Sequence, residues 1–121
     1  MSQNFVQNGK VINAAATDPA TPASGDPVLV NTIPGVALVN EGDGGNVAGQ
    51  TSIATEGVFD LSVKAVDGGG NSAVNAGDKI YYVIADTPKL SKKATGALFG
   101  KALAGITTGS TETIPVMLIQ A

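Results

Sequence analysis

The sequence contains no cysteine and no histidine. Without cysteine the chain has no disulfide framework, no thiolate nucleophile and no Cys-type metal site. Without histidine it lacks the commonest general base and the commonest metal ligand, and a Ser-His-Asp arrangement is excluded. We therefore predict a protein that is not an enzyme and that has no metal site and no cofactor.

Charge is also scarce. Charged residues make up 14% of the chain, against roughly 25% in an ordinary domain, which indicates that a partner covers part of the surface. The formal net charge is −3 and the pI is about 4.6, so a nucleic-acid partner, which needs a basic patch, is not expected. The sequence has no run of about 18 apolar residues, and it opens without a charged region followed by an apolar one. We therefore expect neither a membrane span nor a signal peptide.

Short apolar runs separated by dense punctuation predict the fold class. The chain has 121 residues, the size of one domain, with 16 glycines and 6 prolines. Such a pattern is typical of an all-β protein. We predict a small single-domain β-barrel or β-sandwich with long loops.

The longest predicted strand covers residues 55–63, and its side chains alternate cleanly between two faces. One face carries Phe59, which we expect to anchor the core. The full sets are Gly57, Phe59, Leu61 and Val63 on one face, and Glu56, Val58, Asp60, Ser62 and Lys64 on the other.

Further strands are predicted at residues 28–30, 36–39, 79–84 and 114–119, with another apolar segment at 98–106. Residues 14–24 are rich in Ala, Thr and Pro and predict a loop. Residues 33–35 (Ile-Pro-Gly) predict a turn, and residues 86–95 a short helical turn or hairpin tip. Pro115 is predicted at a strand start or on a sheet edge because it has no N–H to donate.

A weak internal repeat is visible. A Gly-Asp turn with a strand, a Gly-x-Ala-Leu strand and a longer strand follow one another at residues 25–61 and again at 77–119. The spacing differs between the two copies. The pattern fits two similar β units, and it also fits coincidence because Gly-Asp turns are common.

The candidates for chemistry are few. Glu56 and Asp60 lie on one face of a strand roughly 13 Å apart, farther than the roughly 5–9.5 Å between glycosidase carboxylates, so solvated surface charges are the favoured interpretation. The loops at residues 43–46 and 67–71 lack the ligand spacing of a calcium loop. Residues 96–102 (GALFGKA) have one residue too few between the glycines for a phosphate loop, and Ala102 stands where that loop needs Ser or Thr.

Several segments, in their order, resemble a family of small tailed-phage head proteins. They are residues 4–12 (NFVQNGKVI), 24–30 (SGDPVLV), 34–38 (PGVAL), 56–59 (EGVF) and 76–82 (AGDKIYY). That family was long catalogued as a domain of unknown function and includes capsid decoration, or cement, proteins. Some relatives carry a RecA-like recombinase label, which the incomplete phosphate loop argues against here. The loop at 14–24 and the lysine-bearing segment at 86–97 depart from the usual pattern.

The resemblance implies a structural protein of the virion, made in the host cytoplasm and located on the capsid exterior. Such a protein binds the major capsid protein of the expanded shell as a homotrimer at three-fold or quasi-three-fold positions and stabilises the shell against DNA pressure. Its binding needs surface rather than catalysis, which agrees with the low charge.

Within this interpretation, residues 1–12 form an arm and first strand, and residues 13–121 form the β domain. We expect capsid contacts from the arm, with Phe5 and Val6 as apolar anchors, and from the loop at 14–24 in second place. Hydrogen bonds to the capsid are expected from Gln3, Asn4 and Gln7. The predicted trimer interface comprises Tyr81, Val83, Met117 and Ile119.

Two other functions fit the sequence less well. A carbohydrate- or cell-surface-binding β module would use aromatic side chains at loop tips, whereas Tyr81 and Tyr82 are both predicted inside a strand. A minor hydrolase would have to use Glu56 and Asp60.

Overall fold

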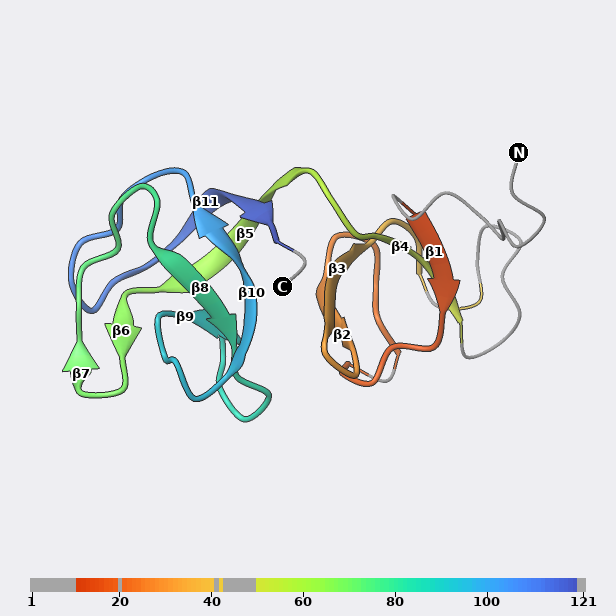
Figure 1. Cartoon of the computed structure of the whole chain (residues 1–121), viewed down its shortest axis with the longest axis horizontal. Helices are drawn as coiled ribbons and strands as arrows, with labels where there is room; N and C mark the ends of the chain where they lie inside the picture. The colour runs from red at the N-terminus through yellow and green to blue at the C-terminus, as the bar shows by residue number, and fades with distance from the viewer. Residues whose placement is uncertain (1–10, 20, 41, 43–49, 120–121) are drawn as a thin grey trace, which may run out of the picture.

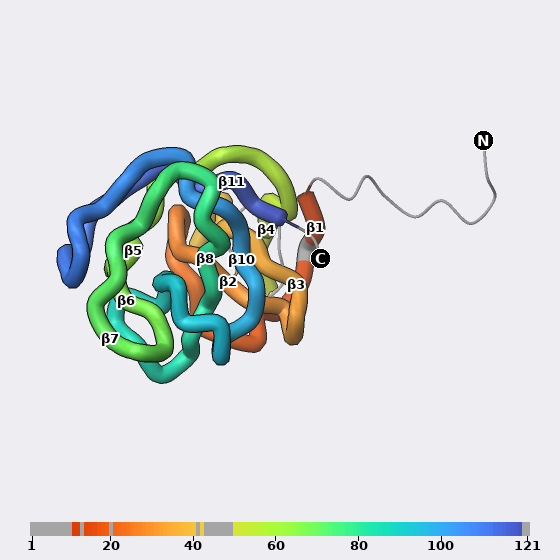
Figure 2. Tube along the Cα trace, turned by 60° about the vertical axis from the view of Figure 1, so that its left-hand side comes forward, coloured from red at the N-terminus to blue at the C-terminus, as the bar shows by residue number. Residues whose placement is uncertain are grey.

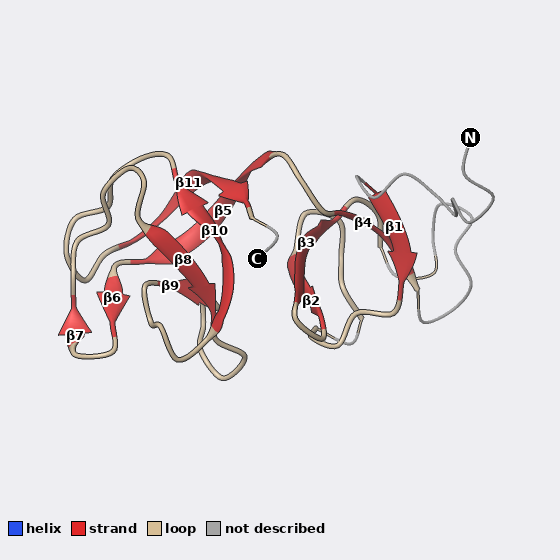
Figure 3. Ribbon diagram, in the orientation of Figure 1, coloured by secondary structure: helices blue, strands red, loops and turns tan. Residues whose placement is uncertain are grey.

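The computed structural model describes residues 11–19, 21–40, 42 and 50–119. In these residues the chain forms strands and loops (Figure 3), and no helix is present that could cross a membrane. The prediction of an all-β fold containing a barrel is confirmed.

The strands form two principal sheets, seen side by side in Figure 1. The first sheet has the order β1-β4-β3-β2 and is antiparallel throughout. Its strands are β1 (Val11–Ala14), β4 (Thr51–Ala54), β3 (Ile33–Ala37) and β2 (Pro27–Val30).

The second sheet is a closed barrel with the order β10-β11-β5-β9-β8. The pairing of β5 with β9 is parallel and the other four pairings are antiparallel. The barrel strands are β5 (Val58–Lys64), β8 (Lys79–Tyr82), β9 (Leu90–Ser91), β10 (Ala97–Ala102) and β11 (Thr111–Leu118), and a small hairpin joins β6 (Val66–Asp67) to β7 (Gly70–Asn71).

The two sheets share one hydrophobic core. Leu29 from β2 and Val36 from β3 are buried in the same cluster as the inward side chains of the barrel, and β3 contacts β10 directly. Tyr82 and Phe99 are fully buried at the centre, with ring centroids 6.0 Å apart. Phe59, the predicted anchor, is partly buried and packs against this cluster. Its position on the inner face is confirmed.

A second, smaller apolar cluster lies on the opposite face of the first sheet. Val28, Ala37 and Ile53 are buried there, and the partly buried Ile12, Ala14, Ala16 and Val30 pack against them. β2 and β3 therefore carry apolar side chains on both faces, which is why their sequences run apolar without alternation.

One of the two local turn predictions is wrong. Residues 33–35 belong to β3, and the turn lies one step earlier at Asn31-Thr32, where Asn31 adopts a φ of 56°. The alternative of a hairpin tip at residues 86–95 is confirmed for residues 86–89, which lie in the loop between β8 and its antiparallel partner β9. The prediction missed β9 itself, whose parallel pairing with β5 helps to close the barrel. The turn at residues 31–32 has a physical reason, because Asn31 tolerates the left-handed conformation that the turn requires.

Pro115 also lies elsewhere than predicted, inside β11 and opposite Asp60 of β5. Its carbonyl oxygen accepts a hydrogen bond from the Leu103 N–H at 3.0 Å. Because the N–H and C=O of a strand residue point to the same side, the missing N–H faces the end of β10. The ladder to β5 therefore loses no hydrogen bond.

The repeated Gly-x-Ala-Leu segments have a physical explanation. A Cβ at Gly35 would meet Ile53 and the Ala54 carbonyl, and a Cβ at Gly100 would meet the Met117 carbonyl. Both glycines thus lie where a neighbouring strand approaches closely. The repeat does not match the sheet boundaries, because β5 pairs with β11 in the barrel rather than with β3.

Residues 1–10 lie outside the described residues, so the division into an arm (1–12) and a domain (13–121) stays a prediction. The proposed boundary falls within β1.

We expect Gly100→Ala to lower the free energy of unfolding by about 1–3 kcal/mol, because the new methyl group overlaps backbone that cannot move freely. Gly68→Ala is the matched control, since nothing lies within 4 Å of a Cβ there, and its effect should stay under about 1 kcal/mol. Urea unfolding followed by circular dichroism measures both. Equal effects of the two changes would contradict the close approach.

Candidate functional site

The four predicted trimer residues lie on one side of the barrel. Tyr81 is on β8, Val83 directly follows it, Met117 is on β11, and Ile119 directly follows that strand. Both strands flank β10. Their alternate side chains Ile80, Tyr82, Val116 and Leu118 fill the core, so the predicted residues share the outer face.

Met117 is the most open of these four side chains, with 40% of its surface exposed. It lies opposite Val58 of β5, which is 52% exposed, and opposite Lys101 of β10. Lys101 in turn lies opposite Lys79 of β8. A row of two apolar and two basic side chains thus crosses four neighbouring strands, and we call it the outer row.

The other three predicted residues are half-buried. Tyr81 lies opposite Leu98 of β10. The Val83 N–H donates to the Lys89 carbonyl at 2.8 Å, and the Ile119 N–H donates to the Phe99 carbonyl at 3.2 Å. These backbone bonds hold both segments against the barrel.

An apolar groove that sequence reasoning missed runs along the junction of the two sheets. Figure 2 shows the C-terminal end of β11 close to β1 and β4. A signal for it was present, because Val58 is an apolar residue on the outward face of an alternating strand. The groove is lined by Val11, Ala54, Glu56, Gly57, Val58, Met117 and Leu118.

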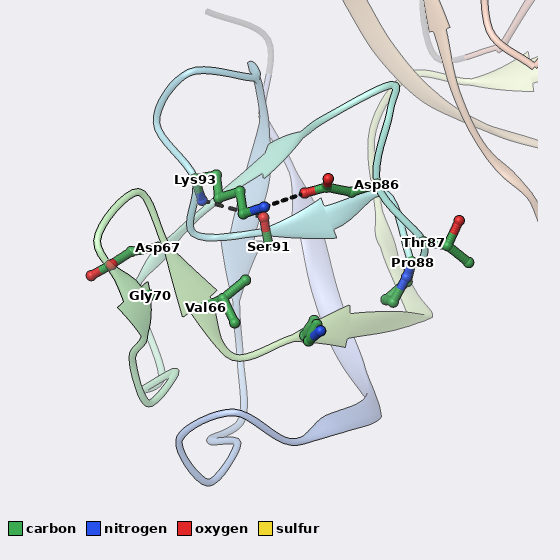
Figure 4. Close-up of a pocket in the computed structure, with 9 residues that line it drawn as sticks. Val66, Asp67, Gly70, Asp86, Thr87, Pro88, Ser91 and Lys93 are labelled. Carbon is green, nitrogen blue, oxygen red and sulfur yellow. Dashed lines mark hydrogen bonds and ion pairs between the residues drawn. The ribbon is translucent and has the colours of Figure 1, made fainter.

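A polar pocket of about 230 Å³ opens beside β6 and β9, and sequence reasoning missed it too. Figure 4 shows the Lys93 side chain reaching toward Asp86, with Nζ 2.8 Å from the carboxylate. The Ser91 hydroxyl accepts a hydrogen bond from the Lys93 N–H at 3.3 Å. The remaining lining residues are Lys64, Val66, Asp67, Gly70, Thr87 and Pro88. The pocket therefore holds charges of both signs, with an ion pair across part of it.

Of the residues considered for chemistry, Glu56 and Asp60 do not line this pocket, whereas Asp67 does. Asp60 is exposed on β5, and Glu56 is exposed just before that strand. Asp67 Oδ1 accepts the Gly69 N–H at 2.8 Å within the β6–β7 hairpin, which is turn chemistry. In the described ranges no three acidic side chains gather to hold a metal ion. Residues 43–46 and the predicted capsid contacts Gln3, Asn4, Phe5, Val6 and Gln7 lie outside those ranges.

A polar brace joins the loop after β1 to the barrel. The Asp18 carboxylate accepts the Tyr82 hydroxyl at 2.5 Å and forms an ion pair with Lys89. The backbone holds Asp18 in place, because the Leu29 N–H donates to its carbonyl at 2.9 Å. The brace therefore fixes part of the 14–24 loop, the second predicted capsid contact, against the shared core.

Burial, hydrogen bonds and charge together set the protonation states of the brace. Burial alone would raise the pKa of Asp18, but hydrogen bonds from Lys89 and Tyr82, together with the Lys89 charge, lower it. Burial and the neighbouring Asp18 carboxylate raise the pKa of Tyr82. The carboxylate is therefore ionised and the phenol neutral at neutral pH, as the hydrogen bond between them requires.

Comparison with known proteins adds one finding. A family model described as phage cement protein matches residues 6–118. Neither curated proteins nor solved structures give a significant match.

We expect Asp18→Asn to lower the free energy of unfolding by about 1–2 kcal/mol at pH 7, because the charge-assisted bonds are lost. A lowered folded-state pKa stabilises the fold above the unfolded pKa, and this contribution disappears as the pH falls through the folded value. The difference between variant and parent should therefore shrink below about pH 4. Denaturant titrations at pH 7 and pH 3 measure it.

Asp60→Asn, at an exposed carboxylate, is the control and should change the unfolding free energy by under about 0.5 kcal/mol. A pH-independent penalty for Asp18→Asn would show that the brace does not depend on the carboxylate charge.

Proposed function

Because the chain belongs to the phage cement protein family, which makes it a capsid decoration protein of a bacteriophage virion, we propose how it acts there. It is made in the host cytoplasm and binds the major capsid protein on the outer surface of the expanded shell. It binds as a homotrimer at three-fold or quasi-three-fold positions, and it stabilises the shell against the pressure of packaged DNA. Its role is structural rather than catalytic.

The outer row is the observation that carries the trimer proposal. Val58 and Met117 are exposed on strands whose inner faces already fill the core, so a second copy is the natural cover for them. Lys79 and Lys101 continue the row, and they suit the rim of an interface. Tyr81, Val83 and Ile119 lie on the same face and extend the contact.

Capsid contact is assigned to the arm and to the 14–24 loop. Phe5 and Val6 supply the apolar anchors of the arm, and Gln3, Asn4 and Gln7 supply hydrogen bonds. The loop presents exposed Ala15, Thr17, Thr21 and Ala23 while the brace holds it in place. A braced loop loses little conformational freedom on binding, which favours affinity.

Threefold symmetry multiplies these small contacts. Three linked copies of a weak contact raise the overall affinity by about 10²–10⁴ without any new interaction, and cyclic symmetry presents the same patch three times. A subunit with little charge and no enzymatic machinery is sufficient for this task.

We expect the purified protein to co-sediment saturably with expanded capsids and not with unexpanded procapsids of the same phage. Deletion of residues 2–8 should weaken that binding at least tenfold, because the arm provides the anchors. Absence of binding to expanded shells would remove the proposal. Full binding by the deletion variant would move the contact to the loop.

We expect Met117→Asp to weaken self-association, because the change replaces an apolar side chain of the proposed contact with a hydrated carboxylate whose burial is costly. Thr113→Asp, at an exposed residue of the same strand, is the control and should leave it intact. Light scattering measures self-association of the free protein. For a trimer that assembles only on the capsid, the number of copies bound per capsid measures it instead. Equal behaviour of both variants in both assays would exclude the outer row from the interface.

A further inference from the structure

The polar pocket beside β6 and β9 lies between the lysine-bearing segment at residues 86–97 on one side and the end of β5 with the β6–β7 hairpin on the other. The Lys92 N–H donates to the Val66 carbonyl at 2.9 Å. The Lys92 ammonium lies 2.8 Å from the Ala73 carbonyl and 3.3 Å from the Asp78 carboxylate. These contacts join the two walls, so the pocket is formed before any ligand arrives.

Two polar side chains from neighbouring strands line this pocket. Lys64 of β5 and Ser91 of β9 are partners in the parallel ladder. The residues before them, Val63 and Leu90, are fully buried in the core. Because side chains alternate along a strand, Lys64 and Ser91 project from the opposite face, where both line the pocket. An ammonium and a hydroxyl are therefore neighbours in one wall.

The Ser91 hydroxyl is a buried group with a hydrogen left to donate. Ser91 is 1% exposed, and its oxygen accepts the Lys93 N–H at 3.3 Å. A hydroxyl carries one donor hydrogen besides its lone pairs, and no group in the described part of the chain accepts it. Buried donors in native proteins nearly always have a partner. The acceptor for this hydrogen therefore comes from outside the chain, as solvent or as a ligand in the pocket.

The charges around the pocket leave one lysine uncompensated. Lys93 Nζ lies 2.8 Å from the Asp86 carboxylate, so these two charges neutralise each other. Figure 4 shows the Asp67 carboxylate turned away from Ser91 and Lys93. Lys64 has no acidic partner among the residues that the structure describes. The pocket therefore offers a positive charge beside a hydroxyl donor, and charge-assisted bonds of this kind are what an oxyanion accepts.

The size and the apolar lining of the pocket narrow the ligand further. Its volume of about 230 Å³ is below the roughly 300–1,000 Å³ of a site for a drug-sized molecule, so it suits a group of a few heavy atoms. Val66 and Pro88 add carbon surface to the lining. An aliphatic chain gains free energy by covering such surface, whereas an inorganic anion does not.

We propose that this pocket binds a carboxylate carried on a short aliphatic chain. Lys64 and the Ser91 hydroxyl hold the carboxylate oxygens, and Val66 and Pro88 contact the carbon atoms. A free small molecule and an acidic side chain of a partner protein both present this chemistry. The pocket shares no residue with the outer row, the arm or the 14–24 loop, so the inference does not require the proposed function.

NMR titration of the full chain with butyrate tests the site, with butyramide as the neutral probe of the same shape. We expect saturable chemical-shift changes at the amides of Lys64, Ser91 and Lys93 with butyrate. Butyramide and inorganic phosphate should each bind at least about tenfold more weakly, since one lacks the charge and the other the carbon chain. No saturable change with butyrate, or equal binding of either comparison probe, would overturn the proposal.

Two variants and a matched control test the assigned residues. Lys64→Met removes the charge and keeps an unbranched side chain, and Ser91→Ala removes the hydroxyl. Each should weaken butyrate binding about tenfold, because a bond to a charged group is lost. Lys79→Met makes the same change at an exposed lysine of β8 outside the pocket and should leave binding unchanged. Equal weakening by Lys79→Met would reduce the effect to general charge attraction and remove the site.

Co-sedimentation with expanded capsids separates the two sources of the carboxylate. If a capsid side chain supplies it, Lys64→Met weakens capsid binding and excess butyrate competes with the capsid. If the ligand is a free small molecule, neither change affects capsid binding while butyrate still binds the free protein. Absence of capsid binding by the parent protein would count against the proposed function alone, because the NMR titration does not involve the capsid.

Discussion

The packing of Leu29 and Val36 into the barrel core is the contact on which the rest of the structure depends. A four-stranded sheet of short strands has too little apolar surface to be stable alone. In β2 and β3, one face packs in the shared core and the other belongs to the second apolar cluster, so apolar side chains are buried on both faces. Gly35 makes the arrangement possible, because any side chain there would collide with β4.

A polar contact accompanies this apolar one. Asp18, Tyr82 and Lys89 link the edge of the first sheet to the barrel at a border where water is only partly excluded. Burying a charge there would be costly without partners, and each group in the brace has one. The hydrophobic packing holds the first sheet and the barrel together. The brace selects one orientation between them, because its hydrogen bonds need a defined geometry.

The sequence predicted what depends on local pattern and missed what depends on long-range pairing. The alternation around Phe59 gave the right faces for β5, and short punctuated runs gave the all-β class. The turn at Asn31 was missed because Pro34-Gly35 is the stronger local turn signal, yet tertiary packing extends it into β3. The brace joins residues far apart in the chain and leaves no local signal. The outer row could be anticipated only in part, since Val58 and Met117 become neighbours through the register of β5 with β11.

The place of β11 in the barrel has a consequence for how the protein is made. β11 lies between β10 and β5, and its partner Leu61 precedes Ile114 by about fifty residues. While the ribosome is still producing the segment after β10, the nascent barrel has two open edges, and the first sheet has no finished core to pack against. Contacts so distant in sequence form slowly. Folding of the barrel and of the first sheet therefore depends on the synthesis of β11, after which both form in one cooperative step. A chain that ends before this strand forms neither of them.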